Sequence, residues 1–316
     1  MRKLLTLAVC GALALGAVAC GDDDDDGGGG SGGGDSGGQV SGKIAIDGSS
    51  TVAPFAQAAQ EAFQAENPDV QITVGTAGTG GGFEKFCAGE TDISNASRPI
   101  KDDEEAPLCK KDGVKYDEVQ VANDGIAVVT NTALKVDCMT LDQLKQVWNK
   151  GSKVKNLSEV DPKLPDTELA LFGPGTDSGT FDFFTDQING EEGQSRSDYE
   201  PSEDDNVIVE GVSGSPGGLG YLGFSYYEQN QEKLNLVGVD GGEGCVKPSL
   251  ETIQNGTYKP LARPIFMYPS EKSLKRPEVK AFMDYILKNQ ETIAKSSQIV
   301  PMTPEQIEKG TTALAG

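Results

Sequence analysis

Short turns rich in glycine, serine and threonine occur three times in the sequence, and each has the composition to bind an anion. They are Gly-Ser-Ser-Thr at 48–51, Gly-Thr-Ala-Gly-Thr-Gly-Gly-Gly at 75–82 and Pro-Gly-Thr-Asp-Ser-Gly at 174–179. The first N–H groups of a helix lack intrahelical partners and lie at the positive end of its dipole, so such turns can hold an anion without a cationic side chain. One such turn is more often an ordinary helix cap, but three in one chain favour a binding function.

A cationic ligand for the same anion is suggested by Arg98, in the segment Ala-Ser-Arg-Pro at 96–99. A guanidinium group can form two parallel hydrogen bonds to a tetrahedral anion. The alternative is an ion pair with the acidic run Asp-Asp-Glu-Glu at 102–105. The segment alone does not separate these two interpretations.

The composition excludes several kinds of function. The chain has no histidine, which rules out Ser-His-Asp and Cys-His nucleophilic sites and His-ligated zinc. With 27 Lys and Arg against 49 Asp and Glu, its net charge of −22 makes nucleic acid an unsuitable partner. An enzyme that works through carboxylates alone, such as a phosphohydrolase using Asp177 and Asp182, remains an alternative to a binding protein, although no dense carboxylate cluster indicates a catalytic metal.

Each of the three turns lies between a predicted strand and a predicted helix. Residues 43–47 alternate as a strand, and an apolar helical stripe follows Pro54. Residues 70–74 form a second strand, with a helix beginning at Phe83 after the turn. Residues 168–173 and 180–188 repeat the arrangement. With 36% apolar residues over 316 positions, the pattern predicts an α/β protein with one or two cores.

The N-terminus predicts export and a membrane anchor. Residues 1–19 combine two basic residues with a short apolar run, which is typical of a signal peptide. Cys20 follows small residues as in a bacterial lipobox, which predicts its lipidation; an ordinary secreted protein cut near Ala19 is the alternative. Residues 20–41, rich in Gly, Asp and Ser, are expected to be a disordered tether about 25 Å in reach.

Four further cysteines, Cys87, Cys109, Cys138 and Cys245, predict two disulfides in an exported chain. Three pairings are open. Proximity in the sequence favours Cys87 with Cys109 and Cys138 with Cys245, and buried free thiols are the other alternative.

Together, the motifs at 47–63, 75–100, 172–185 and 213–227 resemble the PstS phosphate-binding lipoproteins of the bacterial phosphate ABC transporter. The resemblance extends from about Lys43 to Met302. It implies a type II-like periplasmic-binding-protein fold, with two α/β lobes that close on the ligand by a hinge motion. The first lobe is expected at 42–122 plus 262–316 and the second at 123–261, with crossover segments near 119–131 and 259–269.

The resemblance also implies the site. The predicted phosphate ligands are Ser50, Thr51, Thr79, Ser97, Arg98, Ser178, Gly179 and Thr180. The family's proton-accepting aspartate aligns with Ser97, and its arginine at the start of the third motif is replaced by Pro174 and Gly175. We therefore expect Arg98 to supply the missing charge. Asp177 is the main candidate for the proton acceptor and Asp47 another, with a capping role as the alternative for each.

We therefore expect a monomeric receptor, lipid-anchored outside the cell membrane, that captures inorganic phosphate and delivers it to a membrane permease. It should need neither metal nor cofactor and perform no catalysis. The alternatives are a receptor for another tetrahedral oxyanion, such as sulfate or molybdate, the phosphohydrolase, and a surface adhesin. Because the net charge repels anions at long range, affinity should depend on short-range hydrogen bonds and little on ionic strength.

Overall fold

The computed structural model describes residues 40–315 of the chain. The predicted signal peptide, Cys20 and the predicted tether as far as residue 39 lie outside the described residues. Within 40–315, no helix combines the length and the apolar character needed to cross a bilayer.

Strands and helices alternate along most of the chain. The strands are β1 Gly42–Gly48, β2 Val70–Val74, β3 Ile93–Ala96, β4 Val119–Asn131, β5 Cys138–Thr140, β6 Ala170–Pro174, β7 Glu200–Ser202, β8 Gly218–Gly223, β9 Leu234–Asp240, β10 Cys245–Val246 and β11 Ala262–Pro269. The helices are α1 Ala53–Glu66, α2 Gly78–Cys87, α3 Glu105–Asp112, α4 Leu141–Trp148, α5 Gly179–Phe184, α6 Asp205–Gly214, α7 Phe224–Gln229, α8 Leu250–Gln254, α9 Pro277–Ser296 and α10 Pro304–Ala315. Short 3₁₀ turns are η1 Leu157–Glu159 and η3 Ser273–Lys275, and a π-helical turn, η2 Thr185–Asn189, continues α5.

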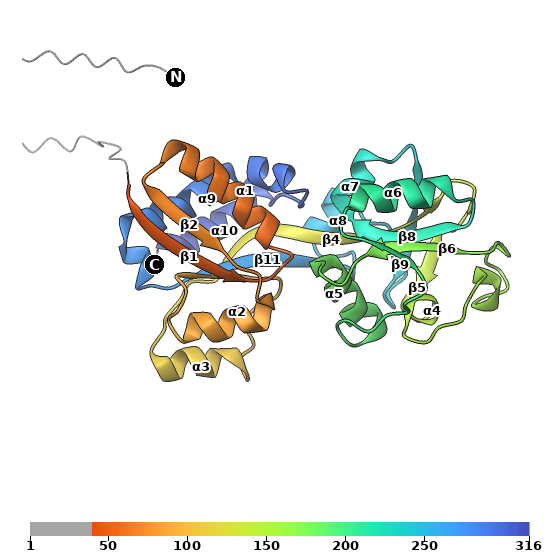
Figure 1. Ribbon diagram of the computed structural model, residues 1–316, viewed down its shortest axis with the longest axis horizontal. Coiled ribbons are helices and arrows are strands. Elements are labelled where there is room, and N and C mark those ends of the chain that lie inside the picture. Colours follow the sequence, from red (N-terminus) through yellow and green to blue (C-terminus); the bar gives the residue numbers. More distant parts are fainter. Residues whose placement is uncertain (1–39, 316) are drawn as a thin grey trace, which may run out of the picture. The chain divides into compact units, whose positions relative to one another are not determined.

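One mixed sheet extends through the described chain in the order β2-β1-β3-β11-β4-β8-β6-β7. β1 pairs in parallel with β2 and β3, and β6 pairs in parallel with β7 and β8. β4 joins the two halves of the sheet. Its residues 119–125 pair with β11, and its residues 126–131 pair with β8 and β9. The prediction of an α/β fold is therefore confirmed, and β4 and β11 form the bridge visible in Figure 1.

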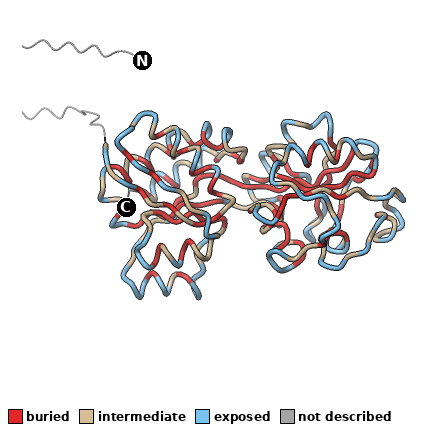
Figure 2. Tube along the Cα trace, in the orientation of Figure 1, coloured by how far each residue is buried: buried red, intermediate tan, exposed pale blue. Residues whose placement is uncertain are grey.

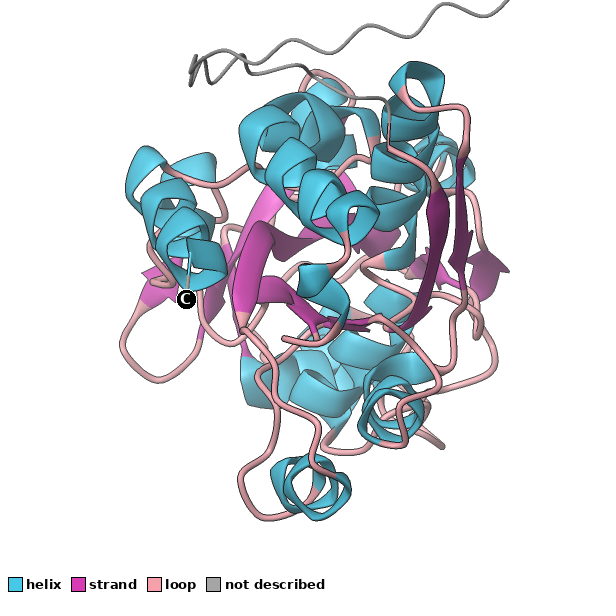
Figure 3. Ribbon diagram, turned by 90° about the vertical axis from the view of Figure 1, so that its left-hand side faces the viewer, coloured by secondary structure: helices cyan, strands magenta, loops and turns pink. Residues whose placement is uncertain are grey.

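Two hydrophobic cores divide the described chain into two lobes. In the first lobe, α1, α9 and α10 cover one face of the sheet, and α2 and α3 cover the other (Figure 3). On the side of α2 and α3, a smaller cluster of buried side chains includes Phe83. The core of the second lobe contains Trp148 and Tyr221, whose rings pack edge to face with centroids 4.9 Å apart. Buried residues fill each lobe and continue along β4 and β11 (Figure 2). The predicted lobe boundaries fall within these two strands, and they stay a prediction.

Most predicted elements form where the apolar periodicity placed them. The strand at 70–74 is β2, and the crossover segment at 119–131 is β4. Phe181, Phe184 and Ile188 are buried, as their helical spacing requires. The predicted start of one helix was wrong. α2 begins at Gly78 rather than at Phe83, so residues 78–82 of the glycine-rich segment are themselves part of the helix.

The predicted disulfide pairing is confirmed. Cys87 bonds Cys109 and joins α2 to α3, and Cys138 bonds Cys245 and joins β5 to β10. The first bridge braces two helices of the first lobe, and the second fixes an edge of the second lobe.

Candidate functional site

The candidate site is a cleft of about 560 Å³ that is lined by both lobes and by the start of β11. Its walls come from the segments that follow the carboxyl ends of the parallel strands β1, β2 and β3 in the first lobe, and β6 in the second. This is where ligands bind in open α/β sheets, because the strand ends and the helix starts present polar backbone groups there. Of the predicted ligands, the cleft lining includes Ser50, Thr51, Thr79, Ser97, Arg98 and Gly179.

Ser50 and Thr51 form the loop between β1 and α1. The N–H groups of Val52 and Ala53 donate to the carbonyl of Ser49, which closes the first turn of the helix. Among the described residues, the N–H groups of Ser50 and Thr51 have no acceptor, although both residues lie in the cleft lining. They are therefore donors available to an anion.

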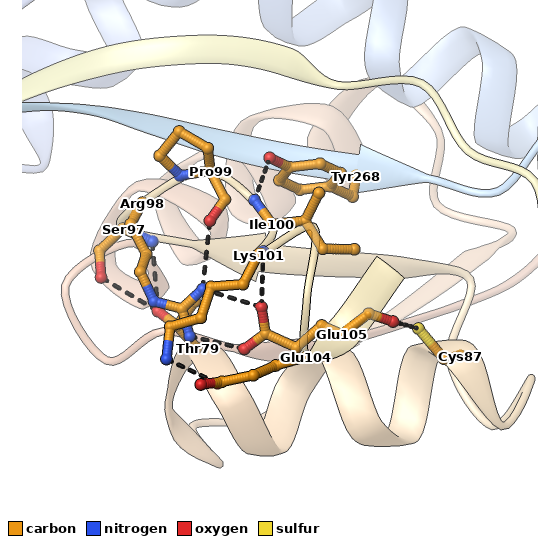
Figure 4. Close-up of polar contacts among 10 residues, drawn as sticks. All are labelled: Thr79, Cys87, Ser97, Arg98, Pro99, Ile100, Lys101, Glu104, Glu105 and Tyr268. Carbon is orange, nitrogen blue, oxygen red and sulfur yellow. Dashed lines mark hydrogen bonds and ion pairs between the residues drawn. The ribbon is translucent and has the colours of Figure 1, made fainter. Parts of the chain in front are cut away.

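Thr79 and Ser97 belong to different elements and meet in the cleft. Their hydroxyl oxygens are 3.0 Å apart, and the Ser97 N–H donates to Thr79 Oγ1 over 3.2 Å (Figure 4). Thr79 lies in the first turn of α2, and Ser97 follows β3 directly. The loop before α2 is held by Asp47, whose Oδ1 accepts from the Ala77 N–H over 2.9 Å. Lys85 pairs with the same carboxylate over 2.5 Å, which gives Asp47 a structural role. Its role as proton acceptor stays a prediction that this geometry does not support.

The second lobe reaches the first through Gly179. A Cβ built on this residue would lie 2.2 Å from Thr51 Oγ1 and 2.6 Å from the Thr51 nitrogen, so the two backbones touch only because no side chain stands between them. The neighbouring predicted ligands Ser178 and Thr180 are not in the cleft lining. Ser178 Oγ accepts from the Thr180 N–H over 3.2 Å, which is the ordinary capping role that the sequence left open.

Asp177, the expected proton acceptor, is exposed and is absent from the cleft lining. Its N–H donates to Glu203 Oε1 over 3.3 Å. Its role as the acceptor stays a prediction that this geometry does not support.

Arg98 lies in the cleft lining, but its guanidinium is engaged by a carboxylate. Its Nη1 and Nη2 donate to the two oxygens of Glu105 over 3.0 and 2.6 Å, and Nη1 also donates to the Pro99 carbonyl (Figure 4). Glu105 is buried with 7% of its side chain exposed, and burial would raise its pKa, but the hydrogen bonds from Arg98 and the Lys101 N–H lower it below its usual value. The ion pair with the 102–105 run is thus present, and Arg98 carries little uncompensated charge.

The cleft contains a second arginine that the prediction from the sequence did not include. Arg263, at the start of β11, lies in the cleft lining beside Pro264. The signal that could have found it is a repeat, since Arg-Pro-Ile occurs both at 98–100 and at 263–265. Only the first copy was considered as a source of charge.

Asp182 is the half-buried carboxylate that faces these groups, and it forms no hydrogen bond through its side chain within residues 40–315. Burial, assisted by the negative charge of Glu192, raises its pKa to about 6, although Arg263 acts in the opposite direction. From the sequence, Asp182 was considered only as a catalytic carboxylate of the alternative phosphohydrolase. Glu192, which also lines the cleft without a donor, is exposed to water, so Asp182 is the half-buried carboxylate of this anion cleft that lacks a donor.

The cleft as a whole offers backbone N–H groups, hydroxyl groups, two arginines and the half-buried, unpaired carboxylate of Asp182. Such a set can bind an oxyanion that carries a proton, since donors match its oxygens and the carboxylate matches its O–H group. No cluster of three or more side chains able to hold a metal ion occurs in the described part of the chain.

Known proteins share this fold and much of this sequence. Residues 33–290 match a family model described as a PBP superfamily domain. The phosphate-binding protein PstS of Staphylococcus saprophyticus is 43% identical over 251 residues, which cover 79% of this chain and 76% of that protein.

Two solved structures extend the comparison. One, from Planctomyces limnophilus, is described as a possible phosphate binding protein; it is 44% identical, with a TM-score of 0.82, over 87% of this chain and 98% of that one. Another, from Clostridium perfringens, is provisionally assigned as a phosphate ABC transporter substrate-binding protein and holds bound phosphate. It is 29% identical, with a TM-score of 0.58, over 83% of this chain and 100% of the other.

Proposed function

The chain belongs to the PstS phosphate-binding proteins of the PBP superfamily, and we propose that it captures inorganic phosphate between its lobes and delivers it to an ABC transporter. The observation that carries the proposal is the contact between the Gly179 backbone and Thr51, because it brings donors from both lobes to one cleft. Its relatives are substrate-binding proteins, and this chain acts in the same way, as a carrier of its ligand without chemical change.

The proposed ligands are the predicted residues that line the cleft, and the other two predicted residues cap a helix. Ser50, Thr51, Thr79, Ser97 and Gly179 supply neutral donors from the cleft lining, and Arg98 contributes the N–H groups that Glu105 and the Pro99 carbonyl leave free. Ser178 and Thr180 act behind the cleft, by capping the helix that carries Gly179. Neutral donors in a partly desolvated cleft bind a compact anion without a large net positive charge.

Selectivity is assigned to Asp182 in place of Asp177. Phosphate keeps a proton at neutral pH and can donate it to the unpaired Asp182 carboxylate, whereas sulfate has no proton and would place two facing acceptors together without a donor between them. The raised pKa of about 6 still leaves this carboxylate mostly ionised at pH 8. Phosphate is therefore preferred over sulfate and molybdate.

The location follows from the N-terminal sequence and the family. Export directed by residues 1–19, lipidation at Cys20 and the tether to residue 41 would hold a monomer at the outer face of the cell membrane, beside its permease. Metabolic labelling with a palmitate analogue tests the anchor. Incorporation in the natural chain and its loss in Cys20→Ala are expected, and labelling that persists in Cys20→Ala would contradict lipidation at this residue.

Calorimetric titration of the purified protein with phosphate, sulfate and molybdate at pH 8 tests the ligand. Saturable binding of one phosphate, with weaker binding of the other two anions, is expected. Tighter binding of sulfate or molybdate would transfer the function to another oxyanion. Release of phosphate from a chromogenic ester would instead support the phosphohydrolase.

A further inference from the structure

Arg263 is the point at which both lobes and both crossover strands meet. It stands in β11, and its Nε donates to Asp124 Oδ2 of β4 over 3.1 Å. Its Nη2 donates to Thr51 Oγ1 of the first lobe over 2.8 Å and to the Gly179 carbonyl of the second lobe over 3.3 Å. One guanidinium group therefore holds the hinge and the two facing walls of the cleft.

The orientation of this guanidinium is fixed from a further side. The ring centroid of Phe183, which also lines the cleft, lies 3.7 Å from the Arg263 guanidinium carbon. Stacking on an aromatic face restricts the plane of the group and stabilises the cation. Arg263 is thus preorganised, and little rotational freedom remains to be lost when a ligand binds.

The hydrogen bonds of Arg263 leave donors unused. A guanidinium has five N–H groups, and in the described part of the chain those on Nη1 meet no acceptor. The side chain is only 13% exposed, and the two N–H groups on Nη1 are left for an acceptor in the cleft. Burial lowers the pKa of Arg263 below its usual value, and Asp124 offsets this only in part. An anion that contacts Nη1 would compensate the charge and also accept from these donors.

Arg98 and Arg263 differ in how strongly their charge is compensated. Glu105 binds Arg98 through both of its oxygens, whereas Asp124 makes a single contact with Arg263. Asp182 and Asp186 act on Arg263 only from a distance, through their charges. A bidentate pair neutralises a guanidinium more completely than a single contact does. Arg263 therefore retains more charge for an anion.

We propose that Arg263 is the main cationic ligand of the bound anion and that the same group couples binding to closure of the lobes. This inference rests on the proposed phosphate-binding function. Nη1 contacts the anion, while Nη2 bonds to Thr51 and Gly179 only when the two walls of the cleft are in contact. Bound phosphate and the closed arrangement thus stabilise each other through one side chain.

Phosphate titration and small-angle X-ray scattering of Arg263→Gln, Arg263→Lys and Arg276→Gln, beside the natural protein, test the proposal. Arg276→Gln is the matched control, because it also removes one arginine, but one that pairs with Asp92 on the first lobe, away from the cleft lining. Arg263→Gln should weaken phosphate binding at least about 30-fold, as expected for removing one partner of a desolvated charged contact. The decrease in radius of gyration on adding phosphate should also become smaller.

Arg263→Lys keeps the charge but loses the fork, so it should bind about tenfold more weakly than the natural protein and should close incompletely. It also serves if Arg263→Gln does not fold. Unchanged phosphate affinity in folded Arg263→Lys and Arg263→Gln, or an equal loss in Arg276→Gln, would overturn the inference. Absence of phosphate binding by the natural protein would instead refute the proposed function itself.

Discussion

Substitution of Gly179 by alanine separates ligand capture from folding. The new Cβ would lie 2.2 Å from Thr51 Oγ1, 2.6 Å from the Thr51 nitrogen and 2.8 Å from Ser50 Oγ. Real Cβ atoms essentially never approach within 3.0 Å of another heavy atom, so the two walls of the cleft must move apart. Overpacking of this kind costs about 1–3 kcal/mol, which corresponds to about a 5- to 150-fold loss of phosphate affinity if the closed state carries the cost.

The fold should tolerate the same change. Gly179 is not among the glycines with positive φ, and the three atoms nearest to the added methyl group all belong to Ser50 and Thr51 of the first lobe. Gly214→Ala is the matched control, because it lies in α6 of the same lobe and a Cβ there meets nothing within 4 Å. We expect Gly179→Ala to unfold at the temperature of the natural protein and to bind phosphate weakly in calorimetry, and Gly214→Ala to bind normally. Unchanged phosphate affinity in Gly179→Ala would refute the closed-cleft account.

Three further predictions concern charge and covalent links. Below about pH 6 Asp182 becomes protonated and can donate, so sulfate affinity should rise; Asp182→Asn should already bind sulfate at pH 8, and calorimetry at both pH values checks this. Burial, together with the negative charges of Asp204 and Asp124, raises the pKa of Asp205 to about 7. The contribution of the protonated Asp205 side chain to stability is therefore complete below about pH 4 and is lost as the pH rises through 7. Asp205→Asn should therefore raise the free energy of unfolding at pH 8 by about 1–3 kcal/mol and remove this dependence, as urea denaturation at pH 4 and pH 8 would show. Replacing Cys138 and Cys245 together by alanine should cost about 5 kcal/mol, against about 3 kcal/mol for Cys87 and Cys109, because the bridges span 107 and 22 residues; urea denaturation compares the two, and equal losses would contradict the loop-entropy reasoning.

The fold was largely predictable, because its elements are repeated short units with clear apolar periodicity. β4 runs through its predicted range, 119–131, since its apolar residues serve both cores. The start of α2 was not predictable from propensity, because glycine is a poor helix former. A Cβ on Gly82 would lie 2.4 Å from Gly48 Cα, so close packing against β1 requires glycine in this first part of the helix.

Of the groups in the candidate site, only the uncharged donors were predictable from the sequence. Turns such as 48–51 show their unpaired donors locally, so sequence alone could indicate them. The charges depend on distant partners: Arg263 meets Thr51 across 212 residues, and no periodicity reports such a contact. Arg98 was found for its local setting, but its charge depends on the carboxylate of Glu105, which the sequence could offer only as one of two alternatives.

A crystal structure of the phosphate complex tests the central claim most directly. We predict one phosphate in the cleft, within hydrogen-bonding distance of the Thr51 and Gly179 N–H groups together, with Arg263 Nη1 on one phosphate oxygen and Asp182 on the protonated one. Phosphate bound by one lobe alone, or outside this cleft, would contradict capture between the two lobes.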